Sequence, residues 1–396
     1  MRVLISGAGV AGPALAYWLN FYGFEPTVVE KAVKLRTGGY IIDFWGAGFD
    51  IARRMGLLPE LNRKGYMVKE VRVVNRQGKR LAGFPATAFS RATGGRYISL
   101  PRGDLAASIF AKIEGRVETI FGDSLRRIDQ MKRGVRVTFE RGAVRDFDLV
   151  IGADGLHSGV RELVFGPQSQ FEKYLGYKVA AFEVDGYRPR DELAYVMYTQ
   201  VGQQVARFAM RGDRTMFLFT FADEETPAPT AFDLQTEKAL LRRRFEDSGW
   251  ECRIALSALD EAHDLYFDRV SQIRMESRPG LWTSGRITLV GDAASSVSLL
   301  AGEGAGLAMM AAYILAGELY RADGDYTRAF ARYQKRFGPF VLRKQKAAVR
   351  FASAFAPKSP LALFLRNQIM KLFKVQWVAN LAVAGDLTDD IAVPEY

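Results

Sequence analysis

The chain has 396 residues, of which 48% are hydrophobic and 25% are charged, so it can bury a large core and is expected to divide into about two or three domains. Its formal net charge is +11, from 55 Lys and Arg against 44 Asp and Glu, but these basic residues are spread along the chain, which favours a solvated basic surface over a nucleic-acid-binding module. A single cysteine excludes an intramolecular disulfide, and with only two histidines a Cys/His metal cluster is excluded as well.

The chain opens directly on an apolar strand pattern, without a charged and then apolar leader. No uninterrupted apolar run approaches the ~20 residues that a membrane span needs. We therefore expect a cytoplasmic protein with no spanning segment.

The N-terminal segment holds the most informative pattern. An apolar run at residues 3–6 leads into Gly7-Ala8-Gly9-Val10-Ala11-Gly12, a helix-like stretch follows at residues 14–19, and a second apolar run ends at Glu30. Strand, glycine turn, helix, strand and acidic residue in this order predict a dinucleotide-binding unit.

Each glycine of such a unit, and the acidic residue at its end, has a physical role. Gly7 would allow the tight turn, Gly9 would let the backbone approach a pyrophosphate, and Gly12 would let the helix pack against the strand. The helix N-terminus offers free N–H groups and a partial positive charge to phosphate, and Glu30 is placed to accept hydrogen bonds from a ribose.

Two later strand ends also carry glycine beside aspartate. Residues 147–152 have the pattern of a buried strand that ends in the polar turn Asp154-Gly155, and residues 286–290 form a second such strand before Gly291-Asp292. A helix is expected to open at residues 100–105, and another, made of small and apolar residues, at Gly302-Glu303-Gly304-Ala305-Gly306.

Between about residues 174 and 223 the pattern changes to strands rich in Phe, Tyr and Met, with hairpin turns at residues 201–203 and 211–213. This change predicts an inserted sheet. Alternation sends about half of its side chains to each face, and we expect Arg207, Phe208 and Phe219 to be substrate neighbours.

The remaining pattern is mainly helical. We expect a helix from about residue 236 to 247, a strand through residues 266–270, and helices after about residue 326. His157, which follows the Asp-Gly turn, is expected to make a local hydrogen bond, and Cys252 to be an inert small hydrophobe.

The glycine-bearing strand ends at Gly7, Asp154-Gly155 and Gly291-Asp292, in this order and at this spacing, resemble the single-component FAD-dependent monooxygenases of the aromatic-hydroxylase family. The resemblance covers nearly the whole chain. Within that family, residues 10–14, 153–158 and 312–319 are most similar to the tetracycline-inactivating monooxygenases and their relatives.

The resemblance implies that the first motif binds the ADP half of FAD. It places the Asp-Gly motif near the pyrophosphate, with a part in nicotinamide binding, and the Gly-Asp motif at the ribityl and pyrophosphate region. Arg102 matches an arginine that packs near the flavin, and no side chain is implied as a catalytic nucleophile or base. The expected cofactor-binding positions are Gly7, Gly9, Ala11, Gly12, Glu30, Lys31, Arg102, Asp154, Gly155, Gly291, Asp292, Gly302, Gly304 and Ala305.

The chain departs from the family at three places. Ser295–Leu300 occupies the place where the family has a histidine and then a proline just ahead of the flavin. Ala311 replaces the family's usual acidic residue, and Lys31 replaces its usual arginine. The first of these departures bears on the shape of the pocket over the flavin and thus on the substrate class.

The implied chemistry needs few protein groups. The helix that begins near Gly302 would stabilise the negative charge of reduced flavin through its N–H groups and dipole. Oxygen would add to flavin C4a to give the hydroperoxide, with NADPH or NADH as a transient reductant, while the protein excludes water.

The C-terminal stretch from Leu361 to Leu381 is amphipathic, with Leu365 and Ile369 on one helical face and Arg366 and Lys371 on another. We expect its apolar face to dock as a lid over the substrate opening or the FAD domain. A helix that lies on a membrane surface is the alternative.

The expected fold is α/β: a Rossmann-like FAD-binding domain of the glutathione-reductase type with an inserted β-sheet substrate domain and a C-terminal helix. The expected division is residues 1–170 and 276–340 for the FAD-binding domain, 171–275 for the substrate-binding sheet, and 341–396 for a C-terminal helical segment.

The expected function is hydroxylation, by O2, of an aromatic or polyketide-like small molecule. Tetracycline-like compounds are among the candidates, and such a substrate would make the enzyme antibiotic-modifying. The alternatives are a flavin-dependent halogenase, although its tryptophan-x-tryptophan-x-isoleucine-proline signature is absent, a prenyl reductase, or a flavoprotein that sequesters a ligand without turnover. We expect a monomer or homodimer.

Overall fold

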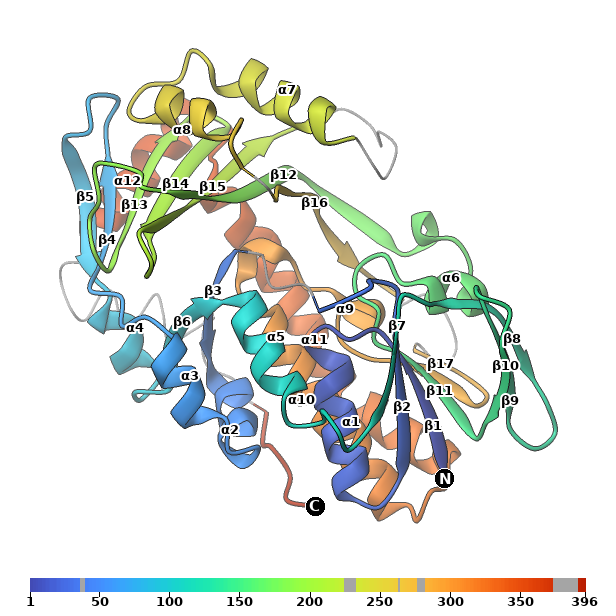
Figure 1. The fold of residues 1–396 in the computed structure, drawn as a ribbon. Coiled ribbons are helices and arrows are strands. Elements are labelled where there is room, and N and C mark those ends of the chain that lie inside the picture. The colour runs from blue at the N-terminus through green and yellow to red at the C-terminus, as the bar shows by residue number, and fades with distance from the viewer. Residues whose placement is uncertain (36–39, 224–232, 263, 276–281, 373–390) are drawn as a thin grey trace.

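The computed structural model describes residues 1–35, 40–223, 233–262, 264–275, 282–372 and 391–396. It has two layered parts, which we call the parallel-sheet domain and the large-sheet domain; the first lies in the lower half of Figure 1 and the second in the upper half. Across the described residues no helix combines the length and the apolar composition that a membrane span requires.

The parallel-sheet domain is built on a six-stranded sheet in the order β17-β18-β11-β1-β2-β7. Every pair in it is parallel except β17 with β18. The central strand β1 is an apolar run buried on both faces, as a covered parallel strand must be. The strands are β1 (Arg2–Ser6), β2 (Glu25–Glu30), β7 (Glu118–Phe121), β11 (Leu149–Gly152), β17 (Thr283–Ser284) and β18 (Ile287–Leu289).

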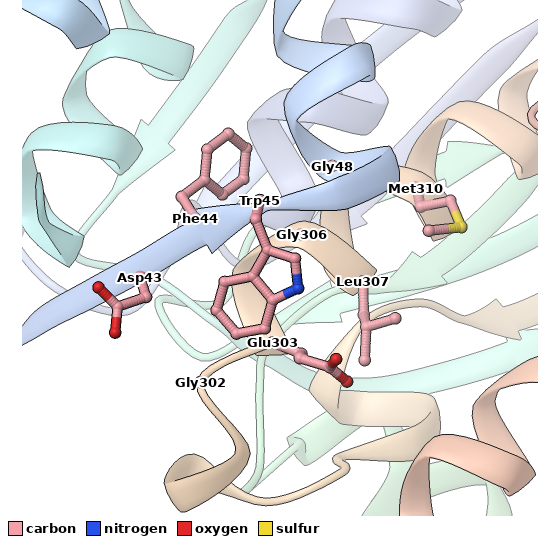
Figure 2. Close-up of a pocket in the computed structure, with 9 residues that line it drawn as sticks. All are labelled: Asp43, Phe44, Trp45, Gly48, Gly302, Glu303, Gly306, Leu307 and Met310. Carbon is pink, nitrogen blue, oxygen red and sulfur yellow. The ribbon is translucent and has the colours of Figure 1, made fainter. Parts of the chain in front are cut away.

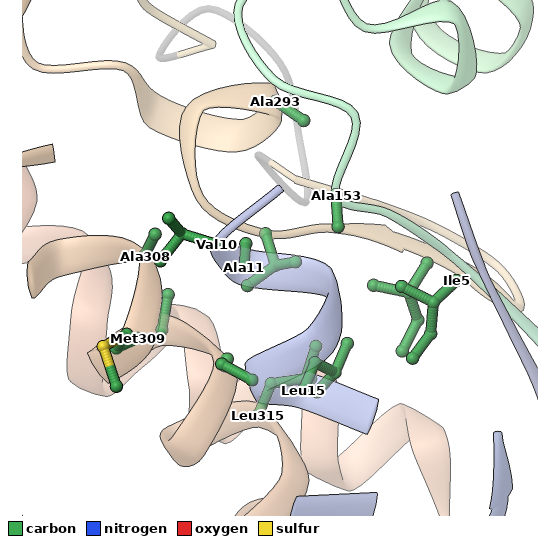
Figure 3. Packing of buried hydrophobic residues seen from close by; sticks show 14 of the residues in the cluster. Ile5, Val10, Ala11, Leu15, Ala153, Ala293, Ala308, Met309 and Leu315 are labelled. Carbon is green, nitrogen blue, oxygen red and sulfur yellow. The ribbon is translucent and has the colours of Figure 1, made fainter. Parts of the chain in front are cut away.

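Three helices pack on one side of this sheet: α1 (Ala11–Phe21), α10 (Gly304–Arg321) and α11 (Tyr326–Phe355). The small and apolar residues of α10 are buried almost throughout, which lets α10 lie close against α1 (Figure 3). Two small sheets complete the domain. They are β8 (Leu125–Gln130), β9 (Val135–Phe139) and β10 (Val144–Phe147), and the pair β3 (Ile41–Trp45) and β6 (Tyr97–Pro101).

The large-sheet domain contains a seven-stranded sheet in the order β16-β12-β15-β14-β13-β4-β5, which we call the large sheet. Helices α7 (Leu234–Phe245) and α8 (Cys252–Ala258) cover its outer face (Figure 1). Its strands are β4 (Glu70–Val74), β5 (Arg80–Pro85), β12 (Glu172–Asp185), β13 (Ala194–Gln200), β14 (Gln203–Ala209), β15 (Arg214–Ala222) and β16 (Tyr266–Ile273).

Connecting helices complete the described part of the chain. They are α2 (Gly46–Arg54), α3 (Leu58–Lys64), α4 (Thr87–Ala92), α5 (Arg102–Phe110), α6 (Gly159–Phe165), α9 (Asp292–Ser295), α12 (Pro360–Leu372) and the short 3-10 turns η1 (Gln168–Gln170) and η2 (Leu299–Ala301).

The α/β prediction is confirmed, and so are both hairpin turns of the inserted sheet. The domain boundaries differ in two respects, the first being that the expected boundary between residues 340 and 341 falls inside α11. The second is that strands β4 and β5 fall inside residues 1–170, yet they extend the large sheet because β4 pairs in parallel with β13, Glu70 opposite Ala194. The large sheet is therefore assembled from two separate parts of the chain.

The C-terminal helix docks differently from the prediction. Helix α12 lies against β5 and buries Met370 among apolar side chains of β4 and β5. The face predicted to dock is exposed instead: Leu365 and Ile369 are each 51% exposed. The predicted residues beyond Leu372, up to Leu381, lie outside the described part of the chain.

Candidate active site

The glycine turn between β1 and α1 is fixed by steric contact. Gly7 has φ +106°, and a Cβ there would lie 2.6 Å from the Ala153 carbonyl oxygen. A Cβ at Gly12 would lie 1.9 Å from the Gly7 carbonyl oxygen, so any larger residue would push α1 away from the turn. Gly9 is different, because a Cβ there would meet only Arg102 Nη2, at 3.9 Å. Gly9 thus leaves open space where a ligand could reach the backbone.

Glu30 is held beside this turn at the end of β2. Its Oε2 accepts a hydrogen bond from Ala8 N at 2.8 Å, and its Oε1 accepts one from Ala32 N at 2.9 Å. Each carboxylate oxygen has a further lone pair for a donor such as a ribose hydroxyl. The neighbouring Lys31 is exposed to solvent.

A second group of polar residues lies where α5, α9 and α10 begin. Arg102 N donates to the Tyr40 carbonyl oxygen at 3.1 Å, and a Cβ at Gly304 would lie 3.8 Å from Asp292 Oδ1. Burial raises the pKa of Asp292, and the nearby Arg102 guanidinium opposes that rise. Gly291 has φ +64°, and a Cβ there would press on Ala11 at 3.0 Å, so the first and third glycine-bearing strand ends are in contact.

The N-terminus of α10 borders a small hollow between α10, α2 and β3 (Figure 2). The first turns of α10 and α2 touch through glycines, because a Cβ at Gly48 would come 2.3 Å from Gly306 Cα. Among the described residues no side chain caps α10, whose N-cap residue Glu303 is paired with Lys344 at 2.7 Å. The residues that line the hollow are Asp43, Phe44, Trp45, Gly48, Gly302, Glu303, Gly306, Leu307 and Met310.

Asp43 on β3 links the two domains and was not predicted as a site residue. Its Oδ1 accepts hydrogen bonds from Tyr97 OH at 2.7 Å and Ser99 Oγ at 2.5 Å on β6, and from Tyr195 OH at 3.4 Å on β13. Burial raises the pKa of Asp43, although these hydroxyl groups oppose the rise. The sequence signal was an isolated acidic residue inside an apolar strand, which alone identifies no site.

Asp154 is engaged within its own turn. Its carboxylate accepts from Ser158 Oγ at 2.5 Å and from Val160 N at 3.1 Å, so it stabilises the start of α6. Gly155 has φ +80° with open space around it. His157 makes the predicted local hydrogen bond, with Nδ1 at 3.1 Å from Gln168 Oε1, and its Nε2 lies 3.4 Å from Asp268 Oδ1, which raises the pKa of the imidazole.

The three expected substrate neighbours separate onto two faces of the large sheet. Arg207 is 3% exposed and pairs with Glu251 at 2.6 Å and Asp191 at 2.8 Å. Phe219 is fully buried against Phe245 of α7. Both therefore belong to the packed layer between the sheet and its covering helices, and this geometry argues against direct substrate contact by either.

Phe208 is on the opposite face, which is turned toward the parallel-sheet domain. It packs against Tyr195 and Tyr66 with ring centroids 4.7 Å and 5.2 Å away. Tyr195 also reaches Asp43, so this face meets β3 of the other domain. We call it the inner face of the large sheet.

These features suit an anionic dinucleotide. Gly9 leaves room at the turn, the N-termini of α1 and α10 carry no cap from a described side chain, Glu30 ends β2, and Asp292 begins α9 shortly after β18 ends. Free N–H groups at a helix start bind phosphate or a delocalised negative charge, and carboxylates there accept from hydroxyls.

Comparisons with known proteins agree with this geometry. The family described as FAD binding domain matches residues 1–324. An uncharacterised protein of Mycobacterium tuberculosis is 40% identical over 347 residues, 87% of this chain and 91% of its own length. A flavin-dependent monooxygenase from an unknown prokaryotic organism is 36% identical over 397 residues, 100% of this chain and 99% of its own. The crystal structure of tetracycline destructase Tet(51) superimposes with a TM-score of 0.82 at 32% identity, covering 100% of this chain and 99% of that one.

Proposed function

Because the chain belongs to the FAD binding domain family and is an FAD-dependent monooxygenase of the aromatic-hydroxylase type, we propose that it consumes NADH or NADPH and O2 to hydroxylate an aromatic or polyketide-like small molecule. FAD, when bound, supplies the electron transfer from the nicotinamide and the activation of O2. The residues of this chain would bind FAD and the substrate, orient them toward each other, and exclude water from the site.

The binding tasks divide among the elements described above. The open turn at Gly9 and the uncapped start of α1 would hold the pyrophosphate, and Glu30 the adenosine ribose. Asp292 and Arg102 would hold the ribityl chain. The start of α10 would face the flavin ring, where its N–H groups stabilise the negative charge of the reduced state.

The inner face of the large sheet is the proposed substrate side. It carries aromatic and apolar side chains, among them Tyr195 and Met197, with Phe208 fully buried against Tyr195 and Tyr66, and it is turned toward the domain that holds the start of α10. Flat, mostly apolar molecules suit such a wall. The likeness to tetracycline destructases supports tetracycline-like compounds as the first class to test.

The observation that carries this proposal is the start of α10, which no side chain among the described residues caps and which lies next to Asp292 and beside the hollow bordered by β3 and α2. The test is NADH and NADPH oxidation, O2 consumption and H2O2 release by purified protein, with and without a panel of phenols and tetracyclines. We expect O2-dependent turnover that a true substrate stimulates. A folded, FAD-loaded protein with no turnover on any compound would favour a ligand-sequestering flavoprotein instead.

The cofactor assignment has its own test in paired glycine variants. Gly9→Val should fold, because a Cβ there meets nothing closer than 3.9 Å, but should lose FAD because the side chain fills the space at the turn. Gly12→Val should fail to fold, since its Cβ would lie 1.9 Å from the Gly7 carbonyl oxygen. Circular dichroism and FAD content measure the two effects, and a Gly9→Val protein with normal FAD content would contradict the assignment.

A further inference from the structure

The segment Ser295–Leu300, which replaces the family's histidine and proline, is buried in this structure. Ser296 is 6% exposed, Val297 2% and Ser298 4%. The segment connects α9, which begins at Asp292, with the turn before α10. Its backbone carbonyl groups are therefore polar groups inside the protein, and they need donors.

The Ile273 backbone N–H donates to the Ser296 carbonyl oxygen at 3.2 Å, and two buried glutamine side chains supply further donors. Gln345 of α11 donates from Nε2 to the Ser296 carbonyl oxygen at 2.9 Å and to the Ile273 carbonyl oxygen at 2.7 Å. Gln272 of β16 donates from Nε2 to the Val297 carbonyl oxygen at 2.7 Å and to the Gln345 carbonyl oxygen at 2.7 Å. The segment is thus joined to the large sheet and to α11 through side-chain amides.

Each of these contacts is made to a backbone carbonyl oxygen, so the glutamine side chain must present a hydrogen-bond donor to it. Gln272 is fully buried, and its Oε1 accepts from Arg274 Nε and Nη2 at 2.9 Å and 2.7 Å, which fixes its amide nitrogen toward Val297. Gln345 is 2% exposed, and its Oε1 has no hydrogen-bond partner among the described residues. A reversed amide would place that oxygen against two carbonyl oxygens, so the nitrogen side is the side the structure uses.

We infer that Gln272 and Gln345 are positioning residues, which hold the Ser295–Leu300 segment in one conformation and so set the shape of the site between Asp292 and the start of α10. Their hydrogen bonds restrict the backbone conformation of the segment, as a proline would do by fixing its own φ angle. The inference rests on the proposed function only where it concerns the flavin.

Both glutamines lie outside the segment that they hold. Gln272 belongs to β16 of the large-sheet domain, and Gln345 to α11 of the parallel-sheet domain. The segment is therefore held from both domains at once, next to the glycines that begin α10. A change in the relative position of the domains would be transmitted to it.

The first experiment needs no flavin. Hydrogen exchange of the peptide that covers residues 295–300 is compared in the wild type, in Gln345→Met and in a control, Gln334→Met. Gln334 is also on α11 but donates to Thr283 Oγ1, at 3.0 Å, away from the segment. We expect exchange to be at least about tenfold faster in Gln345→Met and unchanged in Gln334→Met. Equal exchange in all three proteins would overturn the inference.

The second experiment measures how the glutamine variant changes the properties of the bound FAD. We expect Gln345→Met to retain FAD but to change the visible circular dichroism of the flavin and to raise the fraction of electrons lost as H2O2 at least about twofold. Gln334→Met should leave both unchanged. If the variant keeps the wild-type spectrum and H2O2 fraction, or if Gln334→Met changes them equally, a positioning role is contradicted. A wild type without FAD would contradict the proposed function and leave the exchange result to decide this inference.

A conservative variant separates donation from packing. In Gln345→Glu a protonated carboxyl group can donate to Ser296 again, and burial raises the pKa of such a group above its ordinary value. The flavin spectrum of Gln345→Glu should therefore return toward the wild-type spectrum as the pH falls from about 9 to 6. Gln345→Met should show no such return. An identical pH response of the two variants would show that the side chain acts only by filling space, which overturns the inference.

Discussion

The Asp43 carboxylate is kept at a cost to stability when it is charged, because burial disfavours the charged form. Three hydroxyl groups surround its Oδ1, from Tyr97, Ser99 and Tyr195, and its pKa is raised mainly because burial disfavours the charged form. No cationic group contributes to that shift. A buried carboxylate without a cation is more costly than a neutral amide of the same shape.

This cost predicts a pH-dependent effect of Asp43→Asn. The pKa of Asp43 is raised in the folded state, so its stabilising contribution is complete below the unfolded pKa, near 3.8, and is lost as the pH rises through the folded pKa. The asparagine keeps an acceptor at Oδ1 and does not titrate. Its Tm should exceed that of the wild type by about 1–3 °C at pH 8, and the difference should shrink as the pH is lowered through the folded pKa of Asp43 toward 3.8. A constant difference across this range, measured by thermal unfolding, would contradict the argument.

Residues whose roles are local were predictable from the sequence, and residues whose partners are remote were not. Gly7 and Gly12 stand where a short strand-turn-helix unit leaves no room for a side chain, and the contacts bear this out. Asp43, Gln272 and Gln345 carry no motif, and Gln272 meets its partners only after the chain has folded. Arg207 and Phe219 show a related limit, because alternation tells which residues share a face but not which face is turned inward.

At the scale of elements, α12 shows how an amphipathic pattern can mislead. Its apolar face was expected to dock, yet Leu365 and Ile369 of that face are each 51% exposed. The docked face contains Met370 and Arg366. The Nη1 atom of Arg366 donates to Thr199 Oγ1 at 3.2 Å, and burial lowers the pKa of this arginine to about 10. A long arginine side chain can cover apolar surface with its stem, so a basic residue does not mark the solvent face reliably.

The last residues of the chain form a docking element that periodicity could not reveal. Tyr396 packs against Gly317 of α10, where a Cβ would lie 2.0 Å from its ring, and its hydroxyl donates to the buried Glu318 Oε1 at 2.9 Å. Its ring centroid lies 5.3 Å from that of Tyr313, whose hydroxyl donates to the Pro394 carbonyl oxygen. The C-terminus is thus tied to the helix whose start faces the proposed flavin site.

We predict that Tyr396→Ala lowers the free energy of unfolding by about 1–2 kcal/mol, because it removes a partly buried ring and a hydrogen bond to a buried carboxylate. Tyr396→Phe should cost less, about 0.5–1.5 kcal/mol, because Arg336 still pairs with Glu318 at 3.3 Å. Urea unfolding measures both. Equal stability of Tyr396→Ala and the wild type would show that the tail contributes nothing.

At the scale of the whole molecule, the two domains are joined by polar contacts as well as by covalent connections. Asp43 reaches Tyr195, His157 reaches Asp268, and Gln272 reaches Val297. The large sheet itself contains β4 and β5 from the N-terminal part of the chain. The parallel sheet could be predicted because its units are contiguous strand-turn-helix segments, whereas the pairing of Glu70 with Ala194 joins segments far apart in sequence and leaves no local signal.

Helix α12 closes one side of the inner face of the large sheet. Val71 and Val73 of β4 pair with Tyr195 and Met197 of β13, so they share the face that is turned toward the parallel-sheet domain, and Met370 of α12 packs on them. Removal of α12 would expose that face to solvent. The proposed cofactor residues precede α12 in the chain, and no described contact joins α12 to them.

We therefore predict that truncation after residue 356 leaves FAD bound but raises the fraction of NAD(P)H electrons lost as H2O2, because water gains access to the site where O2 is activated. The matched control is removal of residues 391–396 alone, which keeps α12 and should lower stability without changing the H2O2 fraction. The ratio of product formed to O2 consumed, measured with a substrate found in the panel above, distinguishes the two variants. An unchanged ratio in a folded protein that lacks α12 would remove this helix from water exclusion, and the exposed face of α12 would then be tested for binding to anionic vesicles.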